Sequence, residues 1–204
     1  MRGSKPLIRR VAFSFAGVLI ASSAFAHAGV GNTTGFLHGF AHPIGGPDHV
    51  LAMLGVGLFA ALLGGRALWL VPLSFITMMA AGGALGMCGV NLPLVEFGIG
   101  LSVVAVGAAI MSCANMSVVV AMTFVGFFAI FHGYAHGTEM PTTVSGLEYG
   151  LGFLMATALL HACGLGMGLS LGSVTQRRGQ RVVQLTGAAI AFTGIGMLAA
   201  TAVA

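Results

Sequence analysis

Long apolar segments separated by short polar breaks dominate this sequence. Only 6% of the 204 residues are charged and 57% are hydrophobic, whereas a soluble domain carries roughly 25% charged residues. An α-helix needs about 20 predominantly apolar residues to cross a bilayer. Runs near that length occur at residues 47–64, 67–90, 94–112, 116–134, 145–172 and 182–203. The sequence therefore predicts an all-α, polytopic transmembrane helix bundle of about six spans, and it excludes a soluble globular protein.

The first 26 residues have the features of a secretory signal peptide. Four basic residues precede an apolar stretch at residues 11–23, which is followed by an Ala-Phe-Ala motif typical of a cleavage site. We expect cleavage after Ala26, which leaves one transmembrane domain, residues 27–204, with His27 at its N-terminus. An uncleaved first helix is the alternative, although the apolar stretch is short for a span.

Charge and cysteine content argue against several classes of protein. The chain has eight basic and four acidic residues, and four of the basic ones lie in the expected signal peptide. The remaining domain is therefore formally neutral, so its charge does not indicate a nucleic-acid partner. The three cysteines have no Cys-x-x-Cys spacing, which argues against a disulfide framework or a zinc finger. The breaks between apolar runs are too short for a nucleotide-binding domain, and the sequence predicts neither an enzyme nor an organic cofactor.

Arginine placement predicts the orientation of the bundle. Arg66 lies in the first break, and Arg177, Arg178 and Arg181 lie in the last one. Basic loops remain in the cytoplasm, so both breaks are cytoplasmic if the N-terminus of the cleaved chain is outside. A signal peptide gives the same orientation by an independent argument. We expect a multi-pass protein of the bacterial inner membrane, with its N-terminus and its polar motifs on the periplasmic side.

A polar cluster precedes the first apolar run and extends into its first residues: His38-Gly-Phe-Ala-His42-Pro-Ile-Gly-Gly-Pro-Asp48-His49. Its prolines and glycines predict a break in the helix between His42 and His49. Non-helical backbone at membrane depth persists only where it is buried in protein or lines a cavity. This break therefore indicates part of a metal site or a vestibule leading to one. Asp48 can either bind the metal or orient a ligating histidine, and the sequence does not separate these roles.

A second polar cluster lies near the end of the fourth run. His132, His136 and Glu139 are spaced at i, i+4 and i+7, which places them on one face if the helix continues that far. Imidazole and carboxylate suit nickel, cobalt, zinc or copper(II), while the absence of cysteine disfavours copper(I). The two clusters together predict a divalent-metal site.

Three further residues are isolated candidates for metal handling. Glu96 lies inside an apolar run, and we expect it to contribute to the site. His161 lies deeper, and it is either a satisfied core histidine or a ligand or relay. His27 would combine a free amine and an imidazole if cleavage follows Ala26, which is a chelating arrangement. Glu148, by contrast, reads as an ordinary acidic helix start.

The two clusters resemble the motifs of the HupE/UreJ family of hydrogenase and urease accessory membrane proteins. The family's H-P-x-x-G-x-D-H motif matches residues 42–49, and its F-H-G-x-A-H-G-x-E motif matches residues 131–139. The resemblance covers essentially the whole chain and implies a nickel permease that supplies urease or hydrogenase maturation. It also implies that the metal-handling residues are His42, Asp48, His49, His132, His136 and Glu139. His38 lies outside the motif and remains a candidate on its chemistry alone.

The function expected from these features is uptake of a divalent metal ion from periplasm to cytoplasm, with Ni²⁺ as the substrate. The inferred ligands would equally hold Co²⁺ or Zn²⁺, so only the resemblance selects nickel. The expected partners are the metal ion, the lipid bilayer and, by the resemblance, urease or hydrogenase maturation proteins. One alternative is a membrane metal chaperone or sensor that binds the ion without translocating it. Another is a haem-binding electron carrier, which requires histidines that face each other deep in two spans.

Overall fold

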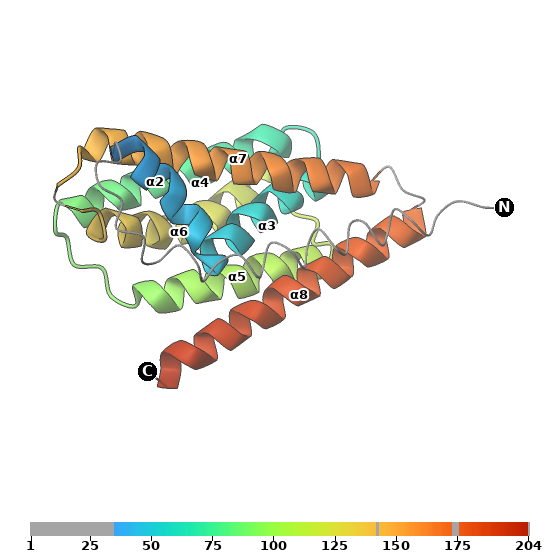
Figure 1. Cartoon of the computed structure of the whole chain (residues 1–204). Coiled ribbons are helices and arrows are strands. Elements are labelled where there is room, and N and C mark those ends of the chain that lie inside the picture. Colours follow the sequence, from blue (N-terminus) through green and yellow to red (C-terminus); the bar gives the residue numbers. More distant parts are fainter. Residues whose placement is uncertain (1–34, 142, 173–175, 204) are drawn as a thin grey trace.

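The computed structural model describes residues 35–141, 143–172 and 176–203, and within these ranges it contains helices and no strands (Figure 1). The helices are α2 (Gly35–Gly45), α3 (Pro47–Leu63), α4 (Ala67–Met87), α5 (Val95–Met111), α6 (Val118–Thr138), α7 (Gly146–Gly172) and α8 (Gln176–Val203). The all-α prediction is confirmed. The predicted signal peptide, its cleavage site and His27 lie outside the described residues.

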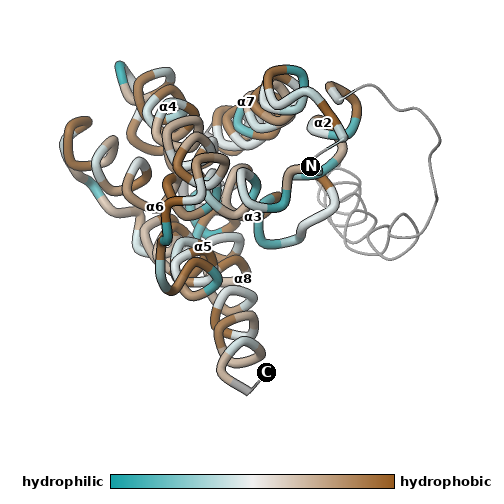
Figure 2. Tube along the Cα trace, turned by 90° about the vertical axis from the view of Figure 1, so that its left-hand side faces the viewer, coloured by the Kyte–Doolittle hydropathy of each residue, from teal (hydrophilic) through white to brown (hydrophobic). Residues whose placement is uncertain are grey.

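Four helices, α4, α6, α7 and α8, are long and apolar enough to cross a bilayer. Helices α2 and α3 meet this test only together, and the pair bends by 83°, so it is either a broken span or a re-entrant loop. Helix α5 is apolar but has only 17 residues. Figure 2 shows hydrophobic residues along every helix. The helices thus fit a membrane protein, while the count of six spans remains a prediction.

The bend between α2 and α3 occurs at Gly46, inside the segment where the sequence predicts a break. Pro47 is the first residue of α3, a position where its missing N–H costs no hydrogen bond. A residue that precedes proline is disfavoured in the helical conformation, and Gly46 accordingly has extended dihedrals of φ −97° and ψ 117°. Helix α2 has 11 residues, too few for a span, so the search for long apolar runs does not separate it.

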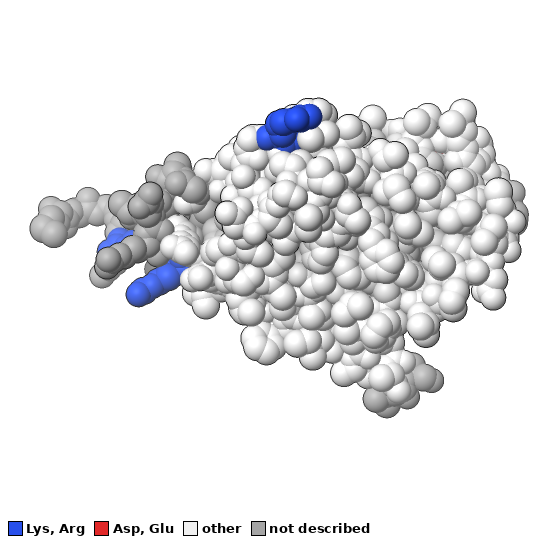
Figure 3. Space-filling model, turned by 180° about the vertical axis from the view of Figure 1, so that it is seen from behind, with Lys and Arg blue, Asp and Glu red and all other residues white. Residues whose placement is uncertain are grey.

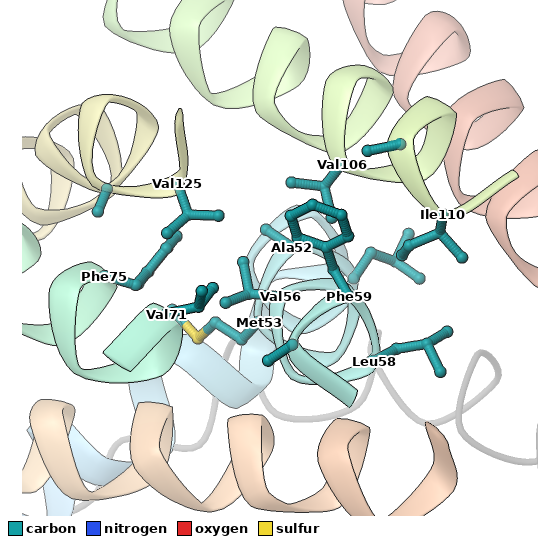
Figure 4. Packing of buried hydrophobic residues seen from close by; sticks show 14 of the residues in the cluster. Ala52, Met53, Val56, Leu58, Phe59, Val71, Phe75, Val106, Ile110 and Val125 are labelled. Atoms are coloured by element: carbon teal, nitrogen blue, oxygen red, sulfur yellow. The ribbon is translucent and has the colours of Figure 1, made fainter. Parts of the chain in front are cut away.

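Helix α3 lies at the centre of the bundle and packs against α4, α5 and α7, while α6 covers α4, α8 covers α5 and α2 covers α7. Figure 4 shows α3 side chains surrounded by apolar residues of its neighbours. The labelled ones are Ala52, Met53, Val56, Leu58 and Phe59 of α3 with Val71, Phe75, Val106, Ile110 and Val125.

Glycines allow α4 and α6 to approach closely. A β-carbon on Gly82 would collide with the backbone of Ile130, and one on Gly133 would collide with the backbone of Met79. The helices therefore touch backbone to backbone, which is the packing that small-xxx-small spacing predicts.

Short connections make successive helices run in opposite directions. As a result α4 and α6 end on the side of the bundle where α3, α5 and α7 begin. Arg66 lies at the opposite end, before α4. Helix α8 starts earlier than predicted, so Arg178 and Arg181 lie in its first turns and not in a loop. The face in Figure 3 shows basic side chains and no acidic ones.

Candidate metal site

A group of three potential metal ligands joins α2 to the end of α6. His42 lies on α2, His136 in the last turns of α6, and Glu139 caps the same helix. Each side chain offers one ligand atom, and these atoms all lie within 4.8 Å of one another. The Nε2–H of His42 donates to Oε2 of Glu139 at 3.1 Å, and the Glu139 side chain is 55% exposed. The group therefore forms a rim that an ion can reach from outside.

His49 lies directly inside this rim. The first turn of α3 presents Asp48 beside it, and Nδ1–H of His49 donates to Oδ1 of Asp48 at 3.0 Å. Nε2 of His49 is buried and has no hydrogen-bond partner in the described part of the chain. If Nδ1 carries the proton, Nε2 carries a lone pair. Asp48 thus holds His49 in the tautomer whose free nitrogen can bind a cation.

Ser102 of α5 acts on His132 in the same way. The Ser102 hydroxyl donates to the carbonyl oxygen of Ile99 at 2.6 Å, and its oxygen lies 2.7 Å from Nε2 of His132. A serine hydroxyl has one proton, so Nε2–H of His132 is the donor in the second bond. Nδ1 of His132 therefore carries a lone pair, and this atom is buried without a partner.

The four histidines form a continuous line, here called the imidazole row: His42, His136, His49 and His132. Successive ring centroids are 4.7, 4.2 and 4.7 Å apart. The row runs from the exposed rim to His132, which is 0% exposed. Like Nε2 of His49 and Nδ1 of His132, both nitrogens of His136 lack a hydrogen-bond partner among the described residues. Leaving a buried polar atom unsatisfied costs about 1–3 kcal/mol. Neighbouring imidazoles with unpaired ring nitrogens suit a cation.

The remaining candidates from the sequence lie at the edge of this site or apart from it. His38 is exposed, and its ring stacks 6.4 Å from that of His42. Glu96 is exposed in the first turn of α5 and is not in the group of ligand atoms at the rim. His161 is buried on α7, and its ring contacts Phe75, which also contacts His132 of the imidazole row.

Sequence reasoning missed Ser102, Tyr149, Phe153 and Thr157, and on this side of α7 it named only His161. Ser102 has no motif to mark it, whereas the α7 residues follow a readable spacing: Tyr149, Phe153, Thr157 and His161 recur every four positions, so they share one face. The Tyr149 ring lies 6.0 Å from His42, and the Phe153 ring lies 4.1 Å from His136. Tyr149 and Phe153 of this face therefore line the outer part of the row.

Comparison with known proteins gives two matches over most of the chain. The model of a family described as HupE / UreJ protein matches residues 15–197. Protein HupE from Rhizobium leguminosarum bv. viciae is 40% identical over 190 residues, which cover 93% of this chain and 97% of that protein. No solved structure matches.

Proposed function

The chain belongs to the HupE/UreJ family, and from this premise we propose that it imports a divalent metal ion, Ni²⁺ in the first place, across the inner membrane. In this proposal the ion enters from the periplasm at the rim formed by His42, His136 and Glu139. It then moves along the imidazole row toward the cytoplasm and supplies hydrogenase or urease maturation.

One observation carries this proposal: ligand groups form an unbroken line from an exposed carboxylate to a fully buried imidazole. A site that only stored or sensed metal would need the rim group alone. A line of neighbouring ligands instead lets an ion exchange one ligand for the next, with no step in which it is bare. Transport requires binding that is favourable enough to capture the ion yet weak enough to release it, and shared ligands such as His136 meet this need.

The chemistry at the rim suits the capture of a hydrated dication. Glu139 supplies negative charge at an exposed position, and the imidazole nitrogens of His42 and His136 replace part of the water shell. Deeper in the row the ligands are imidazoles, and the carboxylate of Asp48 contacts one of them, His49. Orientation of this kind fixes the geometry of a ligand and raises its basicity. The membrane potential then favours inward movement of a dication by about 4.6 kcal/mol per 100 mV.

The two rival functions are supported less well. Perpendicular rings of His49 and His132, with centroids 4.7 Å apart, leave no space for a porphyrin between them, which argues against a haem-binding carrier. A chaperone or sensor would also bind metal at the rim, but that function does not explain why the row continues to the buried His49 and His132.

The test is uptake of radioactive nickel by a nickel-transport-deficient bacterium that expresses the protein. His42→Ala and His136→Ala are compared with the parent at equal membrane abundance, with cobalt and zinc as competitors. Cys163→Ala is the matched control, because Cys163 is exposed on α7 and belongs to no candidate site. Uptake that both histidine variants lose and the control retains supports import through the rim. A parent that binds nickel in detergent but takes up none would favour the binding-only function.

A further inference from the structure

His161 is a buried histidine whose ring nitrogens have no partner among the described residues. Its exposed fraction is 2%, and neither Nδ1 nor Nε2 makes a hydrogen bond to any of these residues. A neutral imidazole has one N–H to donate and one lone pair to fill. At membrane depth no bulk water is present to satisfy them. A histidine kept only for packing would carry an energetic penalty that a leucine at the same position avoids.

The position of His161 relates it to the imidazole row. The ring of Phe75 on α4 lies 5.1 Å from the ring of His161 and 5.7 Å from that of His132. Phe75 therefore contacts both the innermost histidine of the row and His161, which places His161 beside the inner end of the row. No other aromatic contact of His161 is present among the described residues.

The surroundings of His161 include two more groups that can act as ligands. Met79 lies one turn beyond Phe75 on α4, and Thr157 lies one turn before His161 on α7. The Thr157 hydroxyl contacts Sδ of Met79 at 3.8 Å. Phe75 and Met79 of α4 therefore face His161 and Thr157 of α7 across the interface of the two helices. An imidazole, a hydroxyl and a thioether thus share one buried stretch of this interface.

We propose that His161, with Thr157 and Met79, forms an inner station for the divalent cation, reached from His132 along the Phe75 ring that contacts both histidines. This inference rests on the proposed import function and adds a second binding stage to it. The inner station has no carboxylate, so it holds a dication weakly, as a site of passage requires.

The experiment uses the full-length protein with His161→Leu and His161→Gln. Nickel uptake in cells is measured beside nickel affinity and thermal unfolding of the purified protein. We expect His161→Leu to reduce uptake about tenfold or more, a loss typical of damage to a metal site. Nickel binding at the rim should be unchanged, and the melting temperature should equal or exceed that of the parent. His161→Gln keeps a polar side chain, so its nickel uptake should lie between that of the parent and that of His161→Leu.

Different results separate the inference from the proposed function. Parental uptake in His161→Leu would overturn the inner station and leave the import function intact, whereas a parent without uptake would overturn the import function and the station with it. A lower melting temperature together with lost binding in both variants would point to a structural role and contradict the inference.

Introducing a thiolate ligand at position 161 provides a second test that does not depend on transport. His161→Cys is placed in a chain whose natural cysteines, Cys88, Cys113 and Cys163, are replaced by alanine. Cadmium prefers thiolate ligands, so the purified variant should develop cadmium–thiolate ultraviolet absorption that the cysteine-free parent lacks. Thr157→Val in the same background should weaken this cadmium binding. An absent absorption band in the folded variant would contradict a metal station at this position.

Discussion

Nε2 of His132 lies 2.7 Å from Oγ of Ser102, and the Ser102 proton is already donated to the carbonyl oxygen of Ile99 at 2.6 Å. The serine therefore accepts from the histidine and fixes its tautomer. Asp48 accepts from Nδ1–H of His49 at 3.0 Å and fixes a second tautomer. The rings of His49 and His132 stand perpendicular with centroids 4.7 Å apart. Two oxygen acceptors on different helices thus leave both histidines with a free nitrogen in the same buried region.

Replacing Ser102 by alanine should weaken metal binding without unfolding the protein. The ring of His132 would lose the acceptor that fixes its tautomer, and we expect nickel affinity to fall about tenfold, or about 1.4 kcal/mol. Ser102→Thr keeps the hydroxyl and should restore most of the affinity. Isothermal titration of the purified proteins measures the effect. Equal affinities of parent and alanine variant would show that Ser102 does not position His132.

The pair Asp48→Asn and Asp48→Ala should reveal how Asp48 acts. An asparagine carbonyl can still accept from Nδ1–H of His49, whereas alanine cannot. If Asp48 orients His49, the asparagine variant should bind nickel more tightly than the alanine variant, by about tenfold. A carboxylate that binds the ion directly would give equally large losses in both variants. Nickel affinity and melting temperature measured on both proteins decide between the two roles.

The helical organisation could be predicted from the sequence because one physical signal determines it. Apolar runs long enough for a bilayer reproduce the bounds of α3, α4, α5 and α7 to within three residues. The signal fails where a helix continues into polar sequence. It therefore misses the last four residues of α6, and it places the start of α8 after the observed start at Gln176. It also cannot resolve α2, whose fold depends on packing against α7.

The chemical composition of the site could be predicted, but not its internal order. Spacing placed His132 and His136 on one face and a break beside Asp48. Which histidine lies next to which depends on how α2, α3 and α6 approach one another, and the sequence does not contain that distance information. Ser102 was missed for the same reason, since a single serine in an apolar helix has no local pattern. Glu96 lies exposed in the first turn of α5 and outside the group of ligand atoms at the rim, so its contribution to the site stays a prediction.

Removing the charge of Glu139 should affect the capture of metal more than the fold. Glu139→Gln keeps the shape of the side chain at an exposed position, so the melting temperature should not change. Nickel uptake at low nickel concentration should fall about tenfold, because the rim loses its negative charge. Glu148→Gln is the matched control, since Glu148 is exposed at the start of α7 and outside the rim. Equal loss in both variants would indicate a general surface-charge effect.

Two adjacent glycines at the bend between α2 and α3 offer a test of the contact between Asp48 and His49. A β-carbon on Gly46 would lie 2.7 Å from Oδ1 of Asp48 and 3.1 Å from Nδ1 of His49, whereas one on Gly45 would have no neighbour within 4 Å. The φ of Gly46 is −97°, so alanine introduces no backbone strain there. Gly46→Ala should therefore push Asp48 and His49 apart and lower nickel affinity about tenfold, while Gly45→Ala should bind as the parent does. Nickel titration of the two purified variants measures this difference, and similar affinities would show that metal binding does not depend on the contact between Asp48 and His49.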